Sequence, residues 1–139
     1  MEFKKFGNTY LVRINRGEEI VETLKNFAKQ NNIKLASITG IGAVGEAKIG
    51  LFETSTKKYI SRNLKGDFEI VSITGNISTM NKETYLHIHI CLADKNNNTY
   101  GGHLSEAKVS VTGEIFVNVL DGEVDRKLDS DIGINLIKF

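Results

Sequence analysis

The 139-residue sequence contains no proline, no tryptophan and a single cysteine, Cys91. One cysteine cannot form an internal disulfide, which indicates a reducing compartment. The 18 basic side chains nearly cancel the 17 acidic ones, so binding to nucleic acid would need a local basic patch. No apolar run approaches the roughly 20 residues that span a bilayer, and the N-terminus lacks an apolar stretch of signal-peptide length. We therefore expect a cytoplasmic protein without a membrane segment.

Length and composition predict a single domain covering residues 1–139. Hydrophobic residues make up 40% of the chain and charged residues 25%, a mixture typical of soluble globular proteins. A chain near this length buries roughly two thirds of its unfolded surface around one core. No internal repeat, low-complexity segment or linker interrupts the sequence.

One amphipathic helix is predicted between Gly17 and Asn31, because apolar residues recur there on one face. A hairpin around Gly7-Asn8 is predicted before the helix, and further strands after it at residues 35–39, 47–53, 59–63, 68–77, 84–93, 107–120 and 132–137. About seven strands and one main helix favour an α+β fold with a mostly antiparallel sheet. Sheet edges without proline favour association of subunits through strands or sheet faces.

The segment Gly40-Ile41-Gly42-Ala43-Val44-Gly45 matches the glycine spacing of dinucleotide-binding folds. Phosphate binding would need a helix directly after it, whereas the residues that follow alternate like a strand. We therefore predict a bend or bulge there, or a close approach of a neighbouring backbone.

All three histidines fall in one short part of the chain, at His87, His89 and His103. On a strand His87 and His89 share a face, and the alternating aliphatic residues Leu86, Ile88, Ile90 and Leu92 point to the core. A hairpin through the polar turn at residues 94–99 would bring His103 to the same sheet edge, and Gly101-Gly102 would allow the backbones to approach closely. Three neutral imidazoles suit zinc or a similar divalent ion.

Several alternatives remain open for this cluster. The three rings could be ordinary polar residues of a surface strand. Cys91 shares the histidine face and is a less favoured fourth ligand. Zinc held by three histidines and a water is also found in hydrolytic centres. Catalysis would further need a proton-transfer group, for which Glu69 and Glu114 are weak candidates.

These motifs resemble the plant and prokaryote conserved (PPC) domain family, in its stand-alone prokaryotic form. His87-Ile88-His89 and Gly101-Gly102-His103-Leu104 are similar to the family's His-x-His and Gly-Gly-His-Leu signatures. Residues 66–77 are similar to its Gly-Arg-Phe-Glu-Ile-Leu stretch, and Ile38–Ala43 to its glycine-containing strand end. With Thr112-Gly113-Glu114, the motifs follow the family's order over nearly the whole chain.

The resemblance implies a homotrimer of α+β domains, a metal at His87, His89 and His103, and the DNA-binding description that prokaryotic members commonly carry. Two departures limit the transfer. The chain has no proline and no Arg-Gly-Arg-Pro core, so the minor-groove hook of plant members is missing. Asp67 also replaces the arginine of the Phe-Glu-Ile stretch, a region used for protein contacts in plants.

Three hypotheses follow. The first is a zinc-binding homotrimer with a binding or regulatory role rather than an enzymatic one. The second is a metal-dependent hydrolase or lyase acting on a small polar metabolite. The third is DNA binding by the bare domain, which would require basic residues to gather on one face, among them Lys4, Lys5, Lys57, Lys58 and Lys65.

Overall fold

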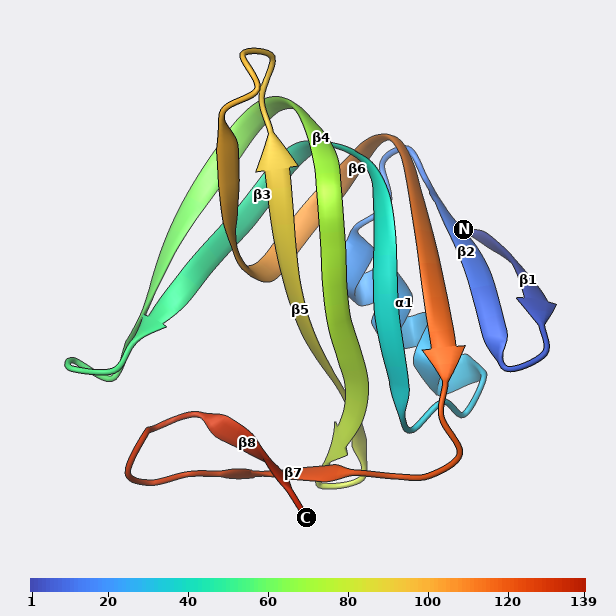
Figure 1. Ribbon diagram of the computed structural model, residues 1–139, viewed down its shortest axis with the longest axis vertical. Coiled ribbons are helices and arrows are strands. Elements are labelled where there is room, and N and C mark those ends of the chain that lie inside the picture. Colours follow the sequence, from blue (N-terminus) through green and yellow to red (C-terminus); the bar gives the residue numbers. More distant parts are fainter.

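The computed structural model describes residues 1–139 as one helix and eight strands (Figure 1). In chain order these are β1 (Glu2–Phe6), β2 (Thr9–Asn15), α1 (Ile20–Gln30), β3 (Ala36–Glu53), β4 (Lys58–Met80), β5 (Glu83–Ala93), β6 (Thr99–Val119), β7 (Asp125–Leu128) and β8 (Asn135–Lys138). The predicted α+β class with a mostly antiparallel sheet and one helix is confirmed. No helix has the length and apolar character needed to cross a membrane.

The main sheet has the strand order β1-β2-β6-β3-β4-β5, and β5 pairs in addition with the first residues of β6. Strands β3, β4, β5 and β6 therefore form a closed ring, in which β6 pairs with the edge of β5 from His89 to Ala93. All of these pairings are antiparallel.

Two strands are much longer than predicted. The segments predicted at residues 35–39 and 47–53 are parts of the single strand β3, which begins at Ala36, and those at residues 59–63 and 68–77 belong to β4. The glycine segment between the two halves of β3 bulges instead of ending the strand, with register shifts between Gly40 and Gly42 and between Val44 and Glu46. A Cβ on Gly40 would lie 2.6 Å from the carbonyl oxygen of Glu114. The predicted bulge and close backbone approach are both confirmed.

The core lies between the sheet and α1, which is behind the sheet in Figure 1 and packs against β5 and β6. Leu24 and Phe27 of the helix are fully buried, as are Ile88 and Leu92 of β5. The helix begins at the cap residue Glu19, whose side chain accepts hydrogen bonds from the backbone N–H groups of Val21 and Glu22. The aliphatic row of β5 thus faces the helix, as its alternation predicts.

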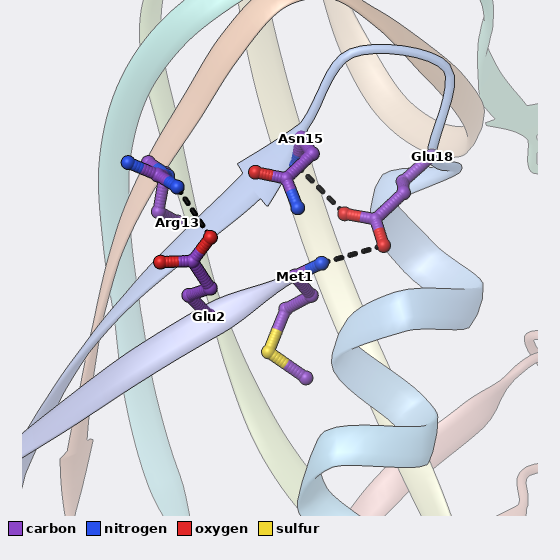
Figure 2. A network of polar contacts seen from close by, with 5 residues as sticks. All are labelled: Met1, Glu2, Arg13, Asn15 and Glu18. Carbon is purple, nitrogen blue, oxygen red and sulfur yellow. Dashed lines mark hydrogen bonds and ion pairs between the residues drawn. The ribbon is translucent and has the colours of Figure 1, made fainter.

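A polar network ties the start of the chain to the approach to α1 (Figure 2). The Glu18 carboxylate accepts hydrogen bonds from the N-terminal amine of Met1 at 2.6 Å and from the backbone N–H of Asn15 at 2.7 Å. Beside it, Arg13 pairs with Glu2 across the β1–β2 hairpin. The amine contact is the largest cause of a lowered pKa at Glu18.

The C-terminal strands β7 and β8 form a separate small sheet that crosses the end of the main sheet, at the bottom of Figure 1. Its attachment to β4 includes a hydrogen bond from the Thr79 N–H to the Val124 carbonyl, 3.0 Å long. The sequence pattern predicts a strand at residues 132–137, but it does not predict β7.

Candidate metal centre

The strand register brings the three histidines together on the sheet face opposite α1. His89 of β5 pairs with His103 of β6, and His87 lies two residues before His89 on the same face. His103 also pairs with Gly50 of β3, because β6 leaves β5 and joins β3 at this residue. The hairpin predicted from the polar turn is therefore present.

The imidazole rings form a compact triangle. Their centroids are 5.1 Å apart for His87 and His89, 5.3 Å for His87 and His103, and 5.7 Å for His89 and His103. One nitrogen from each ring lies within 4.8 Å of the others. His87 and His103 are half-buried and His89 is exposed. Nitrogens that share one ion at Zn–N distances near 2.1 Å lie at most about 4.2 Å apart, so small rotations of these rings would let the three nitrogens hold one divalent ion.

The glycine pair before His103 sets the position of its backbone. A Cβ on Gly102 would lie 2.7 Å from the carbonyl oxygen of Gly50. Only a residue without a side chain permits β6 to run this close to β3. The close approach of backbones that the Gly101-Gly102 pair predicts therefore occurs at Gly102.

The site favours uncharged imidazoles. Burial is the main cause that lowers the pKa of His87 to about 4, and the nearby charges of Arg126, His103 and His89 lower it further. Burial, followed by the charge of His89, also lowers the pKa of His103. Metal ligation requires neutral imidazole. In addition, Nδ1 of His103 is buried without a hydrogen-bond partner, and coordination would satisfy such an atom.

A pocket of about 300 Å³ opens onto this cluster. His87 and His103 line it together with Arg126, Tyr59 and Tyr85, and its remaining wall residues are Phe52, Leu128, Gly133, Ile134 and Asn135. Five of the ten residues that line the pocket come from the β7–β8 hairpin and its turn. Sequence reasoning missed Arg126, because an arginine in a polar, charged stretch reads as a surface residue.

The other predicted site residues lie outside the cluster. Cys91 is on the histidine face and half-buried, opposite Ser72 and Gly101, but it is not part of the group of close ligand atoms. Glu69 lies opposite Ala93 at the far end of β5, and Glu114 lies opposite Arg13 near the other end of β6. The structure does not bring either glutamate to the histidines.

The lysines that a DNA surface would need do not converge. Lys4 and Lys5 belong to β1, whereas Lys57 and Lys58 lie at the β3–β4 turn. These two segments lie on opposite sides of the molecule (Figure 1). A single chain therefore presents no common face formed by both pairs.

Comparison with known proteins gives a consistent family assignment. The family model described as the Plants and Prokaryotes Conserved (PCC) domain matches residues 1–121. A crystal structure from Bacteroides thetaiotaomicron, named as that of a presumed DNA-binding protein, is 38% identical with a TM-score of 0.97, and the match covers 99% of this chain and 96% of that one. The structure of a metal-containing protein from Archaeoglobus fulgidus is 34% identical with a TM-score of 0.88, covering 98% and 97%.

One curated relative is much longer than this chain. The bifunctional protein GlmU from a Synechococcus strain is 25% identical over 96 residues, which are 68% of this chain but 14% of the relative. The chain thus spans about a seventh of the length of the curated relatives it matches.

Proposed function

The chain belongs to the Plants and Prokaryotes Conserved domain family, and from that premise we propose that it binds a divalent, zinc-class metal ion through His87, His89 and His103. The observation that carries the proposal is the approach of three imidazole nitrogens to within 4.8 Å of one another. The depressed pKa values of His87 and His103 and the unpartnered Nδ1 of His103 support it. A relative that is 34% identical is named as a metal-containing protein.

We further propose that the protein is a single domain of residues 1–139 that works in the cytoplasm as a homotrimer. Its lone cysteine supports a reducing compartment. Exposed apolar side chains support association through the sheet: Phe116 of β6 alternates with the buried Ile115 and Val117, so it points away from the core. The register puts Phe116 in one row with Thr39, Thr74 and His89. An assembly covering this outer face would therefore approach the histidines.

Metal analysis tests the proposal. Protein purified without a histidine tag should carry about one zinc-class ion per chain, and a His87→Ala, His89→Ala double variant should carry almost none. Cys91→Ala is the matched control, because it changes the same face of β5 outside the cluster. Equal metal content in the wild type and the double variant would contradict the proposal. Loss of metal in Cys91→Ala would indicate that Cys91 is a fourth ligand.

A binding or regulatory role fits this centre best. DNA is one candidate partner, because two similar structures are named as those of presumed DNA-binding proteins. The near-neutral charge and the separation of the lysine pairs weigh against a strong grip on the phosphate backbone. DNA binding by the bare domain would require several basic residues to contact phosphates, and its affinity should then fall steeply between about 50 and 200 mM salt in a fluorescence anisotropy titration.

The second candidate is a metal-dependent hydrolase or lyase acting on a small polar metabolite. The pocket of about 300 Å³ beside His87 and His103 favours it. A zinc ion held by three histidines supplies an activated water when bound. No carboxylate of this chain lines the pocket, so Glu69 and Glu114 do not supply the proton-transfer group. This candidate predicts metal-dependent turnover of p-nitrophenyl acetate that disappears in the histidine double variant.

A further inference from the structure

Arg126 is a buried cation without an acidic partner. The residue is only 5% exposed. Its guanidinium donates from Nε to Ser78 Oγ at 2.8 Å, from Nη1 to the Asn135 carbonyl at 3.1 Å and from Nη2 to Asn76 Oδ1 at 2.9 Å. The group also stacks over the ring of Tyr85, 4.8 Å from its centroid. No carboxylate lies within the 4.0 Å of an ion pair.

These contacts position the guanidinium but do not balance its charge. All three acceptors are neutral, and an unpaired buried charge is costly unless a counter-ion approaches it. A guanidinium carries five N–H donors. Three of them have partners here, which leaves one on each terminal nitrogen. A buried guanidinium with two free N–H donors and no counter-ion is expected where an anion binds.

The pocket in front of Arg126 is suited to an organic anion. It contains no aspartate or glutamate to compete for the guanidinium. Phe52, Leu128 and Ile134 provide apolar walls. Its volume of about 300 Å³ lies at the lower end of the range for ligand pockets, which indicates a small ligand.

We propose that this pocket binds a small organic carboxylate, with the charged group against Arg126 and the apolar part against Phe52, Leu128 and Ile134. This inference rests on the proposed function: the Arg126 guanidinium would be a second positive group beside the metal ion, and one bound anion would face both. Arginine suits this task because its planar donors match the geometry of a carboxylate. The β7–β8 hairpin, which supplies Arg126, would thus complete a site whose histidines come from β5 and β6.

Titration calorimetry with isovalerate and its uncharged isostere isovaleramide tests the carboxylate preference. Wild-type protein should bind the acid at least about tenfold more tightly, since a hydrogen bond to a charged group outweighs a neutral one by about that factor. Inorganic phosphate is the third probe and should bind more weakly than isovalerate, because it cannot use the apolar walls. Equal affinity for acid and amide, or tighter binding of phosphate, would overturn the inference.

Substitutions locate the charge. Arg126→Gln should weaken the binding of isovalerate by about tenfold and leave the binding of the amide nearly unchanged, whereas Arg126→Lys should keep most of the affinity for the acid. Arg62→Gln, an exposed arginine of β4, is the matched control and should bind like the wild type. An Arg126→Gln variant that melts normally and binds isovalerate as tightly as the wild type would refute the role of Arg126. If that variant does not fold, the wild-type comparison of acid and amide decides.

Metal content measured on the same samples separates this inference from the proposed function. Metal-loaded protein without a preference for the acid refutes the carboxylate pocket and leaves the metal centre standing. Metal-free protein that prefers the acid through Arg126 supports the pocket and refutes the metal centre.

Discussion

Replacing Gly102 by alanine should loosen the junction that holds His103. The new Cβ would lie 2.7 Å from the Gly50 carbonyl oxygen, well inside the ordinary contact distance of 3.4 Å. The three nearest atoms all belong to the backbone of Gly50, so no flexible side chain can move away. β6 and β3 must therefore separate next to His103, the residue at which β6 changes partners from β5 to β3.

The expected cost follows from this contact. Adding a methyl group to a tightly packed site costs about 1–3 kcal/mol. The smaller conformational freedom of alanine in the unfolded chain returns about 0.4–1 kcal/mol. A net loss of about 1–2 kcal/mol should lower the melting temperature by about 3–8 °C in a domain of this size. Displacing the backbone next to His103 should also weaken zinc binding by about 10–100-fold, as changes to supporting residues do in other metal sites.

Thermal unfolding at a fixed protein concentration and competition with a zinc chelator measure the two effects. Gly101→Ala is the matched control, because its Cβ would meet only the Ile90 carbonyl, at 3.3 Å. It should change the melting temperature by less than about 2 °C. A Gly102→Ala protein that melts within about 1 °C of the wild type and binds zinc equally tightly would show that the close approach does not position His103.

Two further predictions concern the start of α1. Glu19→Ala should destabilise the fold by about 1–2 kcal/mol in urea unfolding, because the carboxylate caps the helix and accepts from the Ala107 N–H of β6 at 2.8 Å. Glu19→Gln should recover part of the loss, and equal stability of all three proteins would rule out the capping role. The second prediction is a pH dependence at Glu18, whose pKa is lowered from its ordinary value of 4.5, first by the Met1 amine and then by the Asn15 N–H. The folded state thus favours the carboxylate, so its stabilisation is present above pH 4.5 and is lost as the pH falls through the lowered folded pKa. The stability difference between wild type and Glu18→Gln should be larger at pH 7 than at pH 3, and a difference independent of pH would contradict the network in Figure 2.

Local sequence patterns predict the histidine cluster because its geometry depends on short-range rules. Alternation along β5 separates His87 and His89 from the core face, and the polar turn after Ala93 predicts the return of His103. Both rules involve residues that are close in the chain. The same reasoning predicts the face but not the exact partner, since only the structure shows that His103 pairs with His89 as well as Gly50.

Long-range arrangements escape the sequence patterns. The glycines of residues 40–45 interrupt the alternation and predict two strands, although bulges allow β3 to continue through them. The position of Arg126 depends on where the β7–β8 hairpin docks. No periodic pattern in the sequence predicts that Arg126 is buried against Ser78 and Asn76. Glu69 and Glu114 interrupt strand-like segments, but sequence alone could not show how far along those strands they lie from the histidines.

The two walls of the pocket have different origins in the chain. His87, His89 and His103 belong to one hairpin, β5 and the start of β6, so only a short loop must close to bring them together. Arg126 belongs to the hairpin formed by residues 125–138, which must dock on a finished β4. During synthesis from the N-terminus, the three histidines are therefore in place before Arg126 leaves the ribosome. The pocket is complete only when this later hairpin has folded onto β4.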